Sequence, residues 1–139
     1  MLLRQACAGT VMVVVALAAS ACSSKHTAYA DPQAIATKLT ASGYAVGTMH
    51  AERDGYIAQT GGTSYSTTVG KLAGTAGIDT FANADALRAW VKMSRSLGGV
   101  AVTGDTWAVS LPTATGSQRH ASIGEANGSA KALGGIVAD

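Results

Sequence analysis

The sequence is poor in charged, aromatic and cysteine residues. Of its 139 residues, 13% are charged and 5% are aromatic, and two are cysteines. The 10 basic and 8 acidic residues give a formal net charge of +2, which is too small and too scattered for a nucleic-acid-binding surface. The length favours one small domain. No charge run, heptad array or internal repeat is present.

Signatures of the common enzyme classes are also missing. The chain contains no G-x-S-x-G elbow, no H-E-x-x-H pair, no phosphate-binding P-loop and no G-x-G-x-x-G turn. His26 and His120 fall in segments expected to be flexible, which leaves His50 for the folded domain. A Ser-His-acid triad needs rigid support, and no pattern here provides it. We therefore expect a protein that is not an enzyme and has no cofactor.

What the sequence does have is an export signal at its start. Arg4 precedes an apolar stretch over residues 8–19, and small residues follow it. This order of a charge, an apolar run and small residues is typical of a secretory signal peptide. The apolar run is shorter than the roughly 20 residues of a permanent transmembrane helix. Residues 1–21 are therefore predicted to be a signal peptide.

The end of this segment resembles the lipobox of bacterial lipoproteins. It reads Ala19, Ser20, Ala21 and Cys22, with Ala19 where that family usually has leucine. In such lipoproteins the cysteine thiol receives a diacylglycerol group, and cleavage then makes the cysteine the new N-terminus. The resemblance implies a lipid anchor on Cys22 at the extracytoplasmic face of the cell membrane. Ordinary cleavage after Ala21 and release of a soluble protein is the alternative.

The cysteine content favours lipidation. Cys7 lies in the predicted signal peptide, so Cys22 would remain alone in the mature chain and no internal disulfide could form. A lone exposed thiol is readily oxidised in an exported protein, whereas acylation uses it. Each buried CH₂ of an acyl chain contributes about 0.8 kcal/mol, and two or three chains anchor a protein stably. The membrane is thus one expected partner.

The mature chain is expected to begin with a short polar tether over residues 22–30, followed by a domain over residues 31–112. Asp31 as N-cap and Pro32 at the first helical position predict a helix over residues 31–42. Asn83 is expected to cap a second helix, which carries Leu87 and Trp90 on one face.

Strand patterns fill the rest of this domain. Alternation or turn signals predict strands near residues 44–50, 56–58, 64–69, 78, 100–102 and 106–111. Strands in a meander with two helices predict a two-layer α+β domain, with an antiparallel sheet of about four to five strands. Residues 113–139 are rich in Gly, Ala and Ser, which favours a flexible tail. Gly128 and Gly134 argue against a helix there.

Part of the domain resembles small lipoproteins of actinobacteria. The segments at residues 78–81, 85–91, 98–100 and 104–109 match a run of the form TF…L–AWV…GG–V–GD–W–V behind a lipobox. This family has no assigned activity, so the resemblance implies a fold and a location at the cell surface. Many members carry two cysteines in the middle region, where this chain has none. Trp90 and Trp107 are expected to face each other in the core.

One group of residues has the chemistry of a metal site. His50, Glu52 and Asp54 would project to the same face of an extended strand, because side chains alternate along it. An imidazole and two carboxylates can hold a divalent cation. A solvated strand face beside a turn is the simpler interpretation, and no bound metal is expected.

The sequence thus favours a non-enzymatic surface lipoprotein, anchored through Cys22, that binds or modulates another envelope protein. Two alternatives stay open. One is a lipoprotein of phage or prophage origin that blocks superinfection, which the genomic neighbourhood would identify. The other is a lipoprotein that binds a small ligand or a metal through the face of His50.

Overall fold

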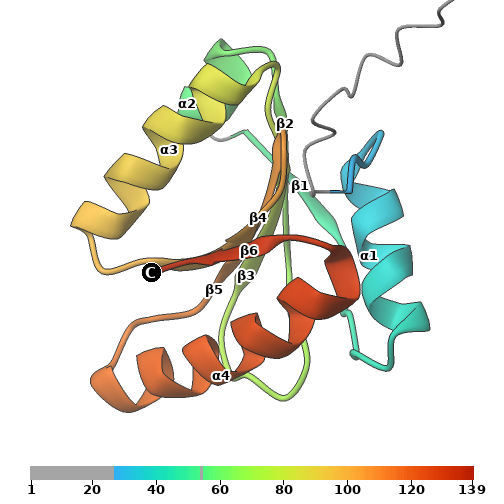
Figure 1. The fold of residues 1–139 in the computed structure, drawn as a ribbon, viewed down its shortest axis with the longest axis vertical. Helices are drawn as coiled ribbons and strands as arrows, with labels where there is room; N and C mark the ends of the chain where they lie inside the picture. The colour runs from blue at the N-terminus through green and yellow to red at the C-terminus, as the bar shows by residue number, and fades with distance from the viewer. Residues whose placement is uncertain (1–26, 54) are drawn as a thin grey trace, which may run out of the picture.

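The computed structural model describes residues 27–53 and 55–139. Six strands form one sheet in the order β1-β2-β3-β5-β4-β6, and every neighbouring pair is antiparallel. Along the chain the elements are α1 (Pro32–Ala41), β1 (His50–Glu52), α2 (Gly55–Gln59), β2 (Thr63–Thr67), β3 (Ala76–Thr80), α3 (Ala84–Ser96), β4 (Val100–Thr103), β5 (Trp107–Leu111), α4 (Gly116–Leu133) and β6 (Ile136–Ala138). Figure 1 shows this arrangement.

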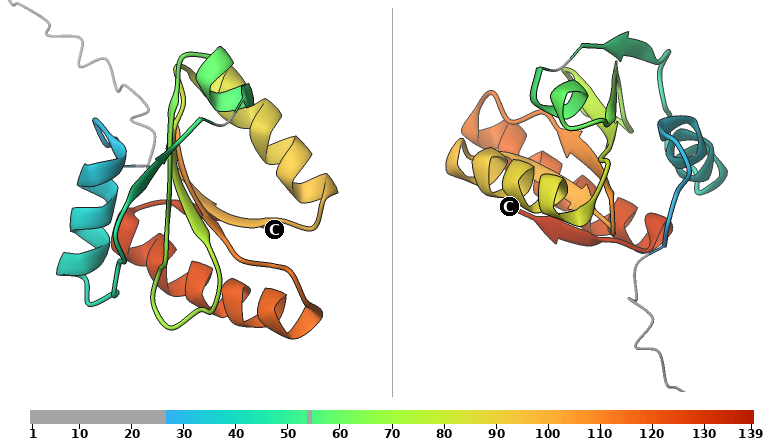
Figure 2. Two further views of the ribbon diagram at one scale, coloured as in Figure 1. Left: turned by 180° about the vertical axis from the view of Figure 1, so that it is seen from behind. Right: turned by 90° about the horizontal axis from the view of Figure 1, so that it is seen from above.

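Helices cover both faces of the sheet (Figures 1 and 2). α1 and α4 pack on one face, and α2 and α3 lie on the other. The α+β class with one antiparallel sheet is confirmed, but the prediction of two layers, two helices and about four to five strands is wrong. The physical reason lies in the central strands: every residue of β4 is buried. Side chains alternate between the faces of a strand, so both faces need a cover.

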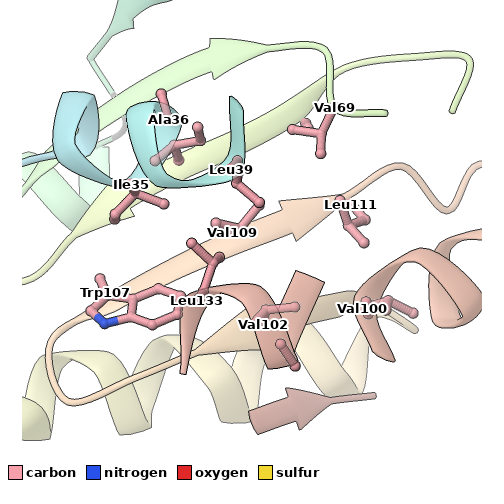
Figure 3. Close-up of a cluster of buried hydrophobic side chains, with 14 residues drawn as sticks. Ile35, Ala36, Leu39, Val69, Val100, Val102, Trp107, Val109, Leu111 and Leu133 are labelled. Atoms are coloured by element: carbon pink, nitrogen blue, oxygen red, sulfur yellow. The ribbon is translucent and has the colours of Figure 1, made fainter. Parts of the chain in front are cut away.

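The larger core cluster lies between the sheet and the helices α1 and α4. Figure 3 shows side chains from α1, the central strands and α4 gathered in this layer. Its fully buried large members include Ile35, Leu39, Val109, Trp107 and Leu133, each 0% exposed. Burying one such aliphatic side chain contributes about 1.5–3 kcal/mol. A smaller cluster around Ile57, Phe81, Leu87, Trp90 and Ala108 fills the other side of the sheet.

The helix starts follow the capping residues. The carboxylate of Asp31 accepts a hydrogen bond from the Ala34 amide at 2.8 Å, and the side chain of Asn83 accepts one from the Ala86 amide at 2.9 Å. Both N-caps have extended backbone, as an N-cap requires. The two helices expected from these signals are confirmed.

Residues 113–139 are not a flexible tail. They form α4 and β6, and three of their small side chains, Ser122, Ala126 and Ser129, are fully buried. Their small size lets the helix lie close to the sheet, so the composition that suggested flexibility serves close packing. Gly134 ends α4 in the left-handed conformation, with φ of 68°, which glycine adopts without steric cost.

The two tryptophans are both buried, but they do not face each other. Trp107 packs against Tyr29 on the α1/α4 side, with ring centroids 5.3 Å apart and the rings nearly perpendicular. Trp90 packs against Phe81 on the α2/α3 side, at 5.5 Å. The sheet separates them because Trp107 points to the same face as Val109 and Leu111, away from α3.

The last part of the expected tether belongs to the folded domain. The Thr27 amide donates to the Gly134 oxygen at 3.1 Å, and the Tyr29 hydroxyl donates to the Leu133 oxygen at 2.9 Å. Burial raises the pKa of Tyr29 above its ordinary value of 10.0. Residues 27–30 are therefore held against the end of α4, and the rest of the expected tether, 22–26, lies outside the described residues.

Two of the expected strands differ in the structure. Residues 56–58 lie in the short helix α2 rather than in a strand. The segment 44–50 contributes a single bridge between Val46 and Val69 before β1 begins at His50. Glycine at position 47 lies tightly against Thr68, so this segment passes close to the sheet without a regular ladder.

Candidate functional site

Two grooves lie beside α3 on the sheet face that it covers only partly. One extends over β1, β2, β3 and β5, and we call it the serine groove. The other lies between α3 and β6, and we call it the edge groove. Trp90 of α3 borders the serine groove, whereas Leu87 and Val91 border the edge groove.

The serine groove has a volume of about 370 Å³. Its lining is mostly polar or small, although it lies in the middle of a sheet whose other half on this face is apolar core. The lining residues are Glu52, Arg53, Ile57, Ser64, Tyr65, Ser66, Thr75, Ala76, Gly77, Asp79, Trp90 and Ser110. Volumes in this range are typical of pockets for small molecules.

The strand register brings these polar residues together in two rows. In the first row, Glu52 of β1 stands opposite Ser64 of β2, and Ser64 stands opposite Asp79 of β3. In the second row, Ser66 stands opposite Gly77, and Gly77 stands opposite Ser110 of β5. Directly opposed residues of antiparallel strands share a face of the sheet. The floor of the groove is therefore three hydroxyls and a carboxylate around one glycine.

Gly77 keeps the centre of the floor open. Its amide donates a hydrogen bond to the Ser110 hydroxyl oxygen at 3.1 Å. A Cβ at this position would lie 2.5 Å from that oxygen and 3.3 Å from Oδ2 of Asp79. The first distance is too short for a carbon atom, so a side chain here would push Ser110 aside.

The charges of the serine groove lie at different depths. Asp79 is 3% exposed, whereas Glu52 and Arg53 at the β1 side are exposed. Glu52 accepts a hydrogen bond of 2.5 Å from the Ser66 hydroxyl. Exposed charges interact weakly because water screens them, while a buried charge acts at low effective dielectric. Asp79 therefore dominates the electrostatics of the floor.

The edge groove is more apolar and has a volume of about 350 Å³. It runs along β6, which pairs with β4 on one side and ends the sheet on the other. Ile136 is 54% exposed beside it. Arg88 and Arg95 of α3 line the same groove, together with residues 103–105. Arg88 pairs with Asp85, and Arg95 Nε donates to the Asp139 main-chain oxygen at 2.9 Å.

The expected metal residues are divided by the structure. His50 and Glu52 both lie on the exposed strand β1, and Asp54 lies outside the described residues. Glu52 lines the serine groove, whereas His50 lines a separate shallow depression with threonines. Within residues 27–53 and 55–139, no three His, Cys, Asp or Glu side chains gather as metal ligands would. The predicted lipid site, Cys22 with residues 19–21, also lies outside the described part of the chain.

Sequence reasoning missed the residues of the serine groove. The signal was present in part, because Ser64 and Ser66 alternate on one strand and Gly77 and Asp79 alternate on another. Alternation predicts that each pair shares a face. It does not say which strands are neighbours or in which register, so the four residues could not be brought together without the fold.

No known protein family, curated protein or solved structure matches this chain. None of the helices in the described ranges is long and apolar enough to cross a bilayer. The functional argument therefore rests on the two grooves and on the way the chain enters the domain.

Proposed function

We propose that this protein is a non-enzymatic lipoprotein, anchored at the extracytoplasmic face of the membrane through Cys22, whose domain binds an extended segment of another envelope protein. The observation that carries this proposal is the edge groove beside β6. A free sheet edge offers main-chain hydrogen bonds to an added strand, and an adjacent groove holds its side chains.

The chemistry of the edge groove indicates the partner. Ile136, Leu87 and Val91 supply apolar contact, so the partner should bring apolar side chains to this groove. The guanidinium groups of Arg88 and Arg95 line the same groove, and guanidinium groups bind carboxylates in fixed geometry. An extended segment with alternating apolar and acidic residues complements this surface.

The entry of the chain supports binding close to the membrane. Thr27 is hydrogen-bonded to Gly134 and to the indole of Trp107, and it follows Cys22 by five residues. An extended chain spans at most about 3.3–3.6 Å per residue, so lipid on Cys22 would hold Thr27 within roughly 18 Å of the bilayer. Residues 103–105 and Ile136, which line the edge groove, adjoin this same end of the domain.

The test of partner binding is site-specific photocrosslinking in intact cells. A photoreactive amino acid at Ile136 should give a discrete crosslinked envelope protein. The same amino acid at Leu97, which is 80% exposed and lies outside the edge groove, is the matched control. Ile136→Lys should then weaken binding of that partner by about tenfold or more, and Leu97→Lys should not. Equal crosslinking at both positions would refute the proposed surface.

The anchor has its own test, which does not depend on the partner. The intact mass of protein from the membrane fraction should correspond to a chain that begins at Cys22 with acyl groups attached. Cys22→Ala should lose both the lipid and the membrane association. Unmodified wild-type protein in the medium would overturn the anchor and leave the edge groove to be tested on a secreted protein.

A further inference from the structure

We propose that the serine groove is a second, independent binding site, which takes a small hydroxylated primary amine with its ammonium group on Asp79. This site does not depend on the proposed partner or on the anchor. It lies across α3 from the edge groove and uses different residues.

The floor of the serine groove is unusual for the middle of a sheet. On the same face, the neighbouring part of the sheet contributes Ala101 and Ala108 to an apolar core under α3. Over β2, β3 and β5 the corresponding positions are Ser64, Asp79 and Ser110, in a groove with about 370 Å³ of open volume. A buried polar surface costs free energy unless it is hydrogen-bonded, so a polar floor of this kind is more economical as a ligand surface than as core.

The carboxylate of Asp79 selects a cationic ligand. It is 3% exposed, so a positive charge placed against it is weakly screened. At the rim, Glu52 and Arg53 carry opposite charges and are exposed, so their fields largely cancel in water. The net charge that a ligand meets on the floor is therefore that of Asp79. A primary ammonium group fits because it is compact and donates up to three hydrogen bonds.

The hydroxyl groups of the floor select a ligand with hydroxyls of its own. Ser110 Oγ accepts from the Gly77 amide, which leaves its O–H to donate to a ligand oxygen. Ser64 stands opposite Asp79 in the register, so its hydroxyl lies on the same face and in the same row as the carboxylate. Serine hydroxyls both donate and accept, which suits a polyol. Trp90 and Ile57 provide apolar wall for the carbon skeleton.

The absence of a side chain at Gly77 gives the ligand its space. A Cβ there would meet both Ser110 Oγ and Asp79 Oδ2, the two groups assigned to hold the ligand. The site as a whole therefore consists of one carboxylate, hydroxyls on two strands and an open centre. A metal ion is a poorer occupant, because the described residues bring no three metal-ligating side chains together.

The test uses the full-length protein in detergent and two probes that differ at one group. Glucamine carries a primary amine where sorbitol carries a hydroxyl, and both are otherwise the same polyol. Calorimetry should show saturable binding of glucamine at least about tenfold tighter than that of sorbitol, as expected for a charged hydrogen bond. Equal affinity for the two probes, or no saturable binding of glucamine, would overturn the proposal.

Two variants and a control assign the effect to the groove. Asp79→Asn keeps the shape of the side chain and should reduce glucamine binding to the level of sorbitol. Ser64→Phe keeps Asp79 and should block both probes by filling the groove. Asp85→Asn removes an exposed carboxylate outside both grooves and should leave binding unchanged. Unaltered glucamine binding by folded Asp79→Asn or Ser64→Phe would refute the assignment, as would its loss in Asp85→Asn.

Discussion

The indole Nε1 of Trp107 donates a hydrogen bond of 2.7 Å to the main-chain oxygen of Thr27. These residues are 80 positions apart in the chain, and Trp107 itself is 0% exposed. The bond joins the first described residue to the centre of the sheet. It also satisfies the one polar atom of the indole, which a fully buried tryptophan requires.

Trp107→Phe should therefore destabilise the fold through this bond as well as through lost packing. The variant leaves the buried oxygen of Thr27 without its donor, which costs about 1–3 kcal/mol in addition to the smaller ring. Urea denaturation followed by circular dichroism measures the change. Trp90→Phe, in the other core cluster, is the matched aromatic control, and an equal loss in both variants would show that the bond contributes nothing.

Tyr29 should make stability depend on pH in the alkaline range. Burial raises the pKa of Tyr29 in the folded state above 10.0, so the folded protein holds this proton more tightly than the unfolded chain does. The stabilisation is fully present below about pH 10 and is lost as the pH rises through the folded-state pKa. Thermal melts across this range should show a steeper decline for the wild type than for Tyr29→Phe. The same slope in both would contradict the prediction.

Gly77→Ala should destabilise the protein by about 1–3 kcal/mol, because its Cβ would overlap Ser110 Oγ. Removing that oxygen relieves the overlap, so the double variant Gly77→Ala/Ser110→Ala should lose less than the sum of the two single variants. Chemical denaturation of all four proteins gives the coupling energy. Additive losses would mean that the two side chains do not share the space.

The packing of α4 can be tested at a fully buried small residue. Ala126 is 0% exposed, so Ala126→Leu should overpack the layer between α4 and the sheet and cost about 1–3 kcal/mol. Gly124 lies in the same helix with open space around its Cα, so Gly124→Ala should stabilise the protein by about 0.5–1 kcal/mol. If residues 113–139 were a flexible tail, neither substitution would change the melting temperature.

Local chemistry in the sequence was enough to predict several elements. Asp31 with Pro32, and Asn83, start their helices where the capping residues indicate, because a cap acts within three or four residues of the chain. The alternation of Trp107, Val109 and Leu111 likewise marks one strand and its buried face. Burial of both tryptophans was also expected from their apolar faces.

Longer-range relations could not be predicted in this way. The short segment 56–58 is a helix because of its place beside β2 and α3, not because of its own pattern. The glycines and serines of 116–133 were taken as signs of flexibility, since nothing local shows that a facing surface exists for them. Small side chains stabilise a helix only when a partner comes close enough to use their size.

The sequence by itself determined where helices α1 and α3 begin, which face of β5 is buried, and that 22 is the single cysteine position after the predicted signal peptide. Each of these depends on residues a few positions apart. The tertiary structure alone decided that helices cover both faces of the sheet, and that Ser64, Gly77, Asp79 and Ser110 share one groove. Strand order and register set those relations, and both arise from packing between segments that are distant in the chain.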